Sequence, residues 1–195
     1  IMNKAAIQDF SLPGNIGKEL PDMTVGIVGT GRIGETLIRH LSGFGCKILA
    51  YDLYEKDSVK QYASYVPLDT LYRESDIISL HIPASEKDYH MISGEVMDTM
   101  KDGVILINTA RGSLIDSRAL IDHIESGKIG AAGLDVVENE FGMYYYDKTT
   151  DVMDNRELAI LKSFHNVVVT PHMAFYTNEA IRDMVYSSLK SCRLE

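Results

Sequence analysis

Short, almost continuously apolar runs alternate along this chain with stretches whose apolar residues recur at helical spacing. The apolar runs predict seven strands, at residues 24–28, 47–51, 63–66, 76–82, 103–108, 130–137 and 166–170. Helical spacing marks residues 32–41, 116–125 (with Asp116 as N-cap) and 178–192. Strands that are apolar on both sides are typical of a parallel sheet covered on both faces. The pattern therefore predicts an α/β fold, a doubly wound parallel sheet with flanking helices and right-handed crossovers.

The composition adds limits rather than a function. The chain has 195 residues, 45% of them hydrophobic, which fits one domain with a substantial core. No run approaches the length of a transmembrane helix, and the first residues lack the pattern of a signal peptide. The net charge of −9 argues against nucleic acid and anionic membranes as partners. Two distant cysteines indicate no disulfide framework, so we expect a reduced, cytoplasmic protein.

A glycine pattern follows the first predicted strand. Gly29, Gly31 and Gly34 form GxGxxG between a strand and a helix, and Asp52 ends the second strand. In a dinucleotide site these glycines allow a tight turn, close approach of the pyrophosphate and close helix packing. Asp52 would accept hydrogen bonds from the adenosine ribose and repel a 2′-phosphate, which favours NAD over NADP. The alternative is a loop that uses glycine only for turns, with Asp52 as a solvated acid.

Three chemically useful side chains follow the last three predicted strands. Arg111, Glu140 and His172 lie just beyond them, at the edge where ligands bind in open α/β sheets. Reduction of a 2-keto acid needs a cation for the carboxylate, an acid for the carbonyl oxygen and a carboxylate that favours the charged histidine. Taken singly, each could instead be an exposed loop residue. Together they predict a catalytic trio.

These motifs resemble the D-isomer-specific 2-hydroxyacid dehydrogenase family, and within it the D-lactate dehydrogenases, including the type associated with vancomycin resistance. The resemblance spans residues 17–183 and rests on GTGRIG, HIP at 81–83, NTARGSLID at 108–116, DVVENE at 135–140 and TPHMAFYT at 170–177. It implies that Arg111 binds the substrate, that His172 is the general acid/base and that Glu140 raises its pKa. Glu138 is a rival for the role of Glu140.

The resemblance also implies a set of cofactor and substrate contacts. Besides the three glycines and Asp52, the cofactor would be contacted at its phosphates, adenine and nicotinamide by Arg32, Ile33, Ile82, Pro83, Thr109, Ala110, Arg111 and Asp135. Phe175 and Tyr176 would border the substrate pocket. Asp88 stands where related enzymes often have an amide, and Asn139 where they have a small residue or proline.

The family also implies a substrate domain that this chain lacks. Residues 1–21 are expected to be a helix end (2–10) and a linker (11–21) from that domain, 22–174 the NAD-binding domain, and 175–195 a helix returning toward the substrate domain. Alone, the 195 residues should bind NADH with negligible turnover. The parent protein is expected to be a homodimer that reduces a 2-keto acid, and the expected reaction is pyruvate to D-lactate.

Other functions remain open at this point. A dehydrogenase for branched 2-hydroxy acids or for phosphoglycerate would share these motifs, and so would an NAD(H)-sensing corepressor. The tyrosine-rich stretch 141–150 predicts a long loop, packed or at an interface. His40, His90, His123 and His165 show no metal-ligand spacing, so no metal site is predicted.

Overall fold

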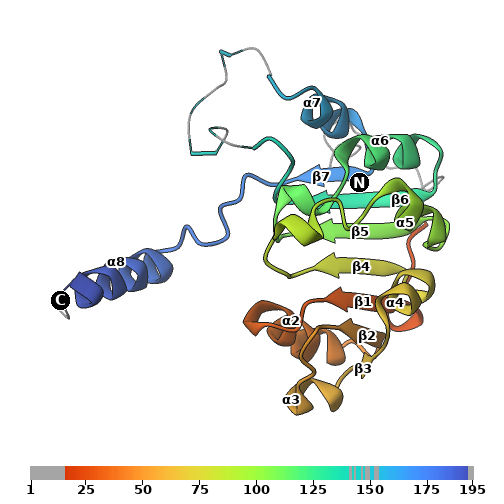
Figure 1. Ribbon diagram of the computed structural model, residues 1–195, viewed down its shortest axis with the longest axis horizontal. Helices are drawn as coiled ribbons and strands as arrows, with labels where there is room; N and C mark the ends of the chain where they lie inside the picture. The colour runs from red at the N-terminus through yellow and green to blue at the C-terminus, as the bar shows by residue number, and fades with distance from the viewer. Residues whose placement is uncertain are drawn as a thin grey trace.

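The fold is a seven-stranded, wholly parallel sheet with strand order β3-β2-β1-β4-β5-β6-β7. The computed structural model describes residues 16–140, 142, 144, 145, 147, 150, 151 and 154–192. Its strands are β1 (Thr24–Val28), β2 (Lys47–Tyr51), β3 (Ser64–Tyr65), β4 (Ile77–Leu80), β5 (Val104–Asn108), β6 (Ile129–Leu134) and β7 (Val167–Val169). All their arrows point the same way in Figure 1, so every carboxyl end lies at one edge. The predicted doubly wound parallel sheet is confirmed.

The two faces of the sheet carry separate cores. On one face α2 (Arg32–Ser42) and α3 (Asp57–Lys60) enclose a small core that includes Val25, Ile27 and Ile38. On the other face α4 (Leu68–Glu74), α5 (Gly94–Thr99), α6 (Ser117–Glu125) and α7 (Arg156–Ser163) cover a larger core. Alternate residues of β1 serve the two cores, because successive side chains of a strand point to opposite faces.

The strand order reverses between β1 and β4: the first three strands are added toward one edge of the sheet and the later ones toward the other. Strands β1, β2 and β3 build outward to one side, and β4 then returns to pair with the free edge of β1. Their carboxyl ends stay in contact, since the His81 N–H donates to the Val28 carbonyl oxygen over 2.7 Å. In sheets of this kind, ligands bind in the crevice at such a reversal. The glycine loop after β1 lies at this point.

Several helices lie between the predicted strands without a clear sequence signal. Helices α3, α4, α5 and α7 have only four to eight residues, too few for their periodicity to stand out. The predicted cap of α6 is confirmed, because an Asp116 carboxylate oxygen accepts the N–H groups of Arg118 and Ala119. Short 3₁₀ turns at Leu20–Asp22, Glu86–Asp88 and Gly112–Leu114 complete the connections.

Some strands are shorter than predicted. β6 ends at Leu134 rather than at residue 137, although Val136 and Val137 are buried. The Val137 N–H donates to the Glu140 side chain instead of to a neighbouring strand. The helix end expected at residues 2–10 lies outside the described residues.

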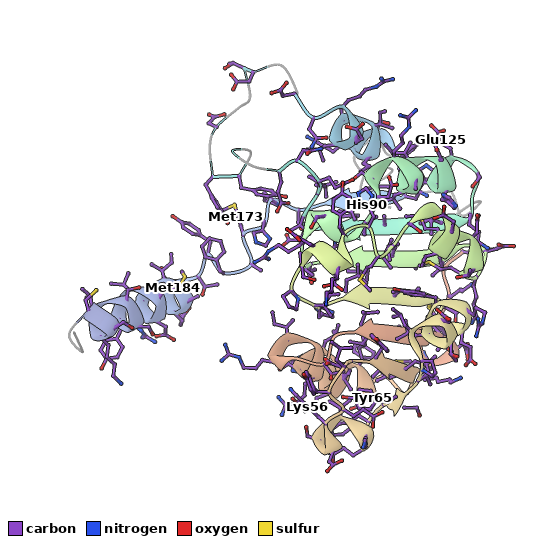
Figure 2. The ribbon with its side chains drawn as sticks, in the orientation of Figure 1. Lys56, Tyr65, His90, Glu125, Met173 and Met184 are labelled. Carbon is purple, nitrogen blue, oxygen red and sulfur yellow. The ribbon has the colours of Figure 1, made fainter. Side chains whose placement is uncertain are left out.

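The C-terminal helix stands apart from the sheet. Helix α8 spans Asn178–Cys192, as predicted, and buries none of its residues. Figure 1 shows it projecting beyond the carboxyl edge of the sheet, and Figure 2 shows Met184 on it, away from the sheet. Met184, Val185, Tyr186 and Leu189 are all exposed. Among the described residues, no helix is long and apolar enough to cross a membrane.

Candidate active site

The glycine loop between β1 and α2 has the geometry of a dinucleotide cradle. Gly29 has a φ of +95°, and a Cβ there would lie 2.6 Å from the His81 carbonyl oxygen. At Gly34 a Cβ would lie 2.0 Å from the Gly29 carbonyl oxygen, so α2 can approach β1 only without a side chain. At Gly31 a Cβ would meet no atom of the described chain within 4 Å. The loop is therefore open where a pyrophosphate would approach the start of α2.

Asp52 is fixed at the end of β2 by this same loop. Its carboxylate accepts the Thr30 N–H over 2.6 Å, the Thr30 hydroxyl over 3.1 Å and the Tyr54 N–H over 3.0 Å. Burial opposes ionisation, but these N–H and hydroxyl donors outweigh it and hold the pKa of Asp52 below its usual value. The ionised carboxylate can accept about four hydrogen bonds, so beside these three it can accept one from a ribose hydroxyl.

The other predicted cofactor contacts border the same crevice. Arg32 and Ile33 are exposed in the first turn of α2, and Ile82 and Pro83 follow β4 beside the glycine loop. A Cβ on Gly29 would touch the Ile82 side chain, which places Ile82 against that loop. The apolar Ile33 side chain is 70% exposed, as expected of a residue that a ligand would cover.

His81 occupies the centre of this edge. Its ring bonds to the Ser79 hydroxyl through Nε2 over 2.8 Å and to the Thr109 hydroxyl through Nδ1 over 3.5 Å. Burial lowers the pKa of His81. These contacts give His81 a part in holding the ends of β4 and β5 together.

The loop that carries Arg111 is shaped by the buried side chain of Asn108. The Asn108 amide donates to the Arg111 carbonyl oxygen over 2.8 Å and accepts the Ala110 N–H over 3.0 Å. The Arg111 guanidinium itself donates to the Ala110 carbonyl oxygen over 2.7 Å. Arg111 is exposed at the edge of the sheet. Its remaining N–H donors can therefore bind an anion.

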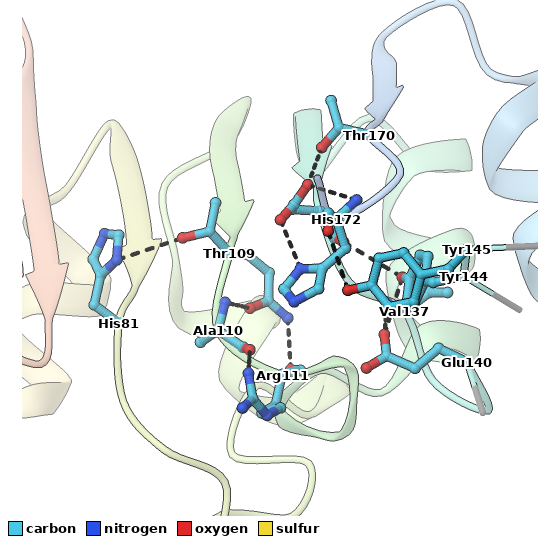
Figure 3. Close-up of polar contacts among 12 residues, drawn as sticks. His81, Thr109, Ala110, Arg111, Val137, Glu140, Tyr144, Tyr145, Thr170 and His172 are labelled. Carbon is cyan, nitrogen blue, oxygen red and sulfur yellow. Dashed lines mark hydrogen bonds and ion pairs between the residues drawn. The ribbon is translucent and has the colours of Figure 1, made fainter. Parts of the chain in front are cut away.

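His172 is held by Asp135, which directly follows β6. An Asp135 oxygen lies 2.8 Å from His172 Nδ1, and its other oxygen accepts the His172 N–H and the Thr170 hydroxyl (Figure 3). His172 has a φ of +53°, an unfavourable backbone conformation for a non-glycine residue that often marks functional sites. With Nδ1 bonded to the carboxylate, Nε2 is the ring nitrogen available to a substrate.

The predicted contact between His172 and Glu140 is not the one the structure forms. Glu140 instead accepts the Val137 N–H over 2.9 Å and the Tyr144 hydroxyl over 3.1 Å. The Tyr144 ring lies 5.6 Å from the His172 ring, measured between centroids. Burial and the Glu140 charge raise the pKa of Tyr144, which keeps its hydroxyl a neutral donor. Thus Tyr144 contacts Glu140, while Asp135, predicted as a nicotinamide contact, pairs with the histidine.

Glu138 is occupied elsewhere as well. One of its oxygens lies 2.6 Å from His90 Nε2 and the other accepts the Ser117 N–H over 2.8 Å. Ligand atoms of His90, Asp116 and Glu138 lie within 4.8 Å of one another. Such a group could hold a metal ion, although these residues are far apart in the sequence and no metal site was predicted. Because its carboxylates already accept main-chain N–H groups, we interpret it as a hydrogen-bonded network that ties loops together.

Aromatic rings line the outer side of the histidine. Tyr145 packs edge-on against Phe175 with ring centroids 5.8 Å apart, and Phe175 packs likewise against Tyr176 at 6.1 Å. Tyr144 connects this row to His172. Phe175 and Tyr176, the predicted pocket residues, thus lie in one row with two tyrosines of the stretch that was predicted to be a packed or interface loop.

Comparison with known proteins identifies the family. Residues 4–174 match the model of the D-isomer specific 2-hydroxyacid dehydrogenase, NAD binding domain. The chain belongs to this family. It is 48% identical over 189 residues to an aromatic 2-oxoacid reductase of Clostridium sporogenes, covering 96% of this chain and 57% of that one. NAD is accordingly the cofactor of the domain, and the glycine loop and Asp52 fit it.

Solved structures agree with this assignment. A D-lactate dehydrogenase of Treponema pallidum superposes with a TM-score of 0.92 at 40% identity, over 98% of this chain and 58% of the other. A D-lactate dehydrogenase of Aquifex aeolicus, solved with NAD and lactic acid, gives 0.90 at 36% identity over 98% and 59%. The chain thus spans little more than half the length of the relatives it matches.

Three residues of the site were not predicted from the sequence. Asn108 was expected only to end a strand, Tyr144 was expected to lie in a loop, and His90 was expected not to bind a metal. Asn108 could have been suspected as a polar residue at the end of an apolar strand. For Tyr144 and His90 no local signal exists, because their partners lie in other segments of the chain.

Proposed function

We propose that the protein of which these residues form part is an NAD-dependent D-2-hydroxyacid dehydrogenase that reduces pyruvate to D-lactate. One observation carries the proposal: the glycine loop, Arg111 and the Asp135–His172 pair all lie at the carboxyl edge of one sheet. That edge is where the fold binds ligands. Two solved D-lactate dehydrogenases share this domain over nearly its whole length.

Each residue has a role that its chemistry allows. NADH supplies the hydride when bound. Arg111 would orient the substrate carboxylate through its planar donors, and His172 would donate a proton to the carbonyl oxygen from Nε2. Asp135 fixes the ring by its bond to Nδ1 and favours the protonated imidazole. Glu140 would act beside this pair, with Tyr144 as its neutral hydrogen-bond donor.

The test is turnover of pyruvate and NADH by the full-length protein. His172→Ala should lower kcat by about a hundredfold or more while NADH binding stays intact, since general acid catalysis contributes roughly 10²–10⁴-fold. Arg111→Ala should mainly raise KM for pyruvate. The proposal fails if the wild-type protein binds NADH tightly but reduces none of a panel of 2-keto acids. That result would favour an NAD(H)-sensing binding protein of the corepressor type.

A second candidate substrate is a 2-oxo acid with an aromatic side chain. The row of Tyr144, Tyr145, Phe175 and Tyr176 would offer such a side chain edge-to-face contacts. A relative with 48% identity is named an aromatic 2-oxoacid reductase. The ratio of kcat/KM for phenylpyruvate to that for pyruvate decides between the two. A branched 2-keto acid in the same panel tests the remaining alternative.

Further properties belong to the proposal for the parent protein. We expect a cytoplasmic homodimer without nucleic-acid or membrane partners, and light scattering of the full-length protein tests the dimer. The 195 residues alone should bind NADH but turn over no substrate. Residues 1–21 and 175–195 would connect this NAD-binding domain, residues 22–174, to a substrate domain. Substantial pyruvate reduction by the 195 residues would contradict that division.

A further inference from the structure

A histidine outside the predicted site joins the two loops that carry Arg111 and Glu140. His90 lies in the turn before α5 and contacts residues that follow β5 and β6. Its Nε2 lies 2.6 Å from a Glu138 oxygen and its Nδ1 lies 3.7 Å from an Asp116 oxygen. Asp116 follows Arg111 by five residues, and Glu138 precedes Glu140 by two. We call His90, Asp116 and Glu138 the His90 cluster.

The main chain around His90 is tied to the Arg111 loop. The His90 N–H donates to the Ser113 carbonyl oxygen over 2.9 Å, and the Ile92 N–H donates to Leu114 over 3.0 Å. His90 has a φ of +52°, and the Tyr89 ring stacks on its imidazole at 3.9 Å between centroids. The ring is therefore fixed from its backbone and from one face.

The two carboxylates are fixed in turn. The second Glu138 oxygen accepts the Ser117 N–H at the start of α6, and the second Asp116 oxygen caps the same helix. The Glu138 side chain is only 16% exposed. The His90 ring contacts both carboxylates, because Nε2 can donate to Glu138 over 2.6 Å and Nδ1 lies 3.7 Å from Asp116, beyond hydrogen-bond distance. Removing the ring would leave two half-buried negative charges next to each other.

The loops themselves press together beside the cluster. A Cβ on Gly112 would lie 2.1 Å from both the carbonyl carbon and oxygen of Val137, so the Arg111 loop packs directly on the chain that leads to Glu140. The Val137 N–H in turn holds the Glu140 carboxylate. Repulsion between Asp116 and Glu138 would push the two loops apart, because the loops pack on each other beside these two carboxylates.

From this arrangement we infer that His90 is a positioning residue, which sets the placement of Arg111 relative to Glu140 by contacting both Asp116 and Glu138. The inference rests on the proposed function for its effect on catalysis, but not for its effect on the loops. A displacement of about 1 Å at a reacting centre lowers rates by roughly a hundredfold. Loss of His90 should therefore lower kcat and raise KM for the keto acid. NADH affinity should change much less, because the glycine loop and Asp52, which would hold the pyrophosphate and the ribose, follow other strands than the Arg111 loop does.

The test compares His90→Asn with His123→Asn. Asparagine tolerates the left-handed backbone at residue 90, and its short amide does not reach Glu138. His123 is a matched control, since it is also half-buried and bonded to a carboxylate, that of Asp98 at 3.2 Å, but lies on α6 away from the site. Glu138→Gln is the second variant, because it keeps the side-chain size and an oxygen for Ser117.

Two readouts separate this inference from the proposed function. In the 195-residue chain, hydrogen exchange at Ser117 and Val137 should become about tenfold faster in His90→Asn and not in the control. In the full-length protein, kcat should fall about ten- to hundredfold, with the NADH dissociation constant within about twofold of wild type. The double variant with Glu138→Gln should lose little more than either single one.

Hydrogen-exchange rates and a kcat equal to those of His123→Asn would overturn the inference. A parallel loss of NADH affinity and global stability would overturn it too, because that result is expected of a histidine that only supports the fold. Faster exchange in His90→Asn with no turnover even by the wild-type protein would retain the coupling of the two loops but overturn the proposed dehydrogenase activity.

Discussion

Substitutions of two glycines in the same loop should have different effects, one on cofactor binding and the other on the stability of the fold. Gly31→Ala adds a methyl group where no atom of the described chain lies within 4 Å of its Cβ. Gly34→Ala adds the same group 2.0 Å from the Gly29 carbonyl oxygen. The two changes are chemically identical and three residues apart, so each serves as the control for the other.

The expected magnitudes differ sharply. Gly31 is the N-cap of α2, where alanine costs up to about 1 kcal/mol of stability. Its methyl group would occupy the space of a pyrophosphate, which loses one or two hydrogen bonds to charged oxygens at about 1.5–3 kcal/mol each. That is a rise of about ten- to hundredfold or more in the NADH dissociation constant. For Gly34→Ala, α2 must move off β1, which costs about 1–3 kcal/mol or more of folding free energy.

NADH fluorescence titration and urea unfolding of the 195-residue chain measure both effects. We expect Gly31→Ala to unfold close to wild type and to bind NADH weakly, and Gly34→Ala to lose stability as well as binding. Wild-type NADH affinity in Gly31→Ala would refute the assignment of this loop as the pyrophosphate cradle. Wild-type stability of Gly34→Ala would contradict the close packing of α2 on β1.

Three further changes test other parts of the account. Asp52→Asn removes the charge that would repel a 2′-phosphate on the ribose. Because two charges 4 Å apart near a surface repel each other by about 1–4 kcal/mol, the ratio of the NADPH to the NADH dissociation constant should fall about tenfold or more. An unchanged ratio in titrations would exclude Asp52 from cofactor selection. Tyr72 is buried, its hydroxyl has no partner among the described residues, and burial raises its pKa. Its neutral form is favoured in the folded state, so stability is complete below the unfolded pKa of about 10 and falls as the pH rises above it. Tyr72→Phe should therefore leave stability at pH 7 within about 1 kcal/mol of wild type or higher, and make urea midpoints fall less steeply above about pH 10; an identical alkaline profile would count against the burial of this hydroxyl. Asn155→Ala removes the cap of α7, where Asn155 accepts the Leu158 N–H over 2.9 Å, and should lower the free energy of unfolding by about 1–2 kcal/mol, with Ser163→Ala at the exposed end of the same helix as the control.

The fold could be predicted largely from the apolar runs, because buried parallel strands read almost continuously as hydrophobic. β1, β2 and α8 have the predicted bounds, and Asp116 caps α6 as expected. β6 was predicted too long, because Val136 and Val137 are as apolar as a strand. β6 ends at Leu134, where its pairing with β7 ends, and the Val137 N–H donates to the Glu140 side chain, a contact that hydrophobicity does not encode.

The site divides in the same way. Arg111, Glu140 and His172 could be placed at one edge, because the carboxyl ends of parallel strands lie together. Their pairing could not be predicted. His172 is 37 residues from Asp135, and His90 is 48 from Glu138, and such contacts depend on how loops turn. The left-handed backbone conformation at His90 and His172 could not be predicted from the sequence either.

Incubation of the full-length protein with pyruvate and NADH, followed by NADH absorbance and by chiral chromatography of the product, measures the proposed reaction itself. We expect NADH oxidation with D-lactate as the product, and loss of that activity in His172→Ala with NADH binding retained. Formation of L-lactate, or equal rates for wild type and His172→Ala, would contradict it.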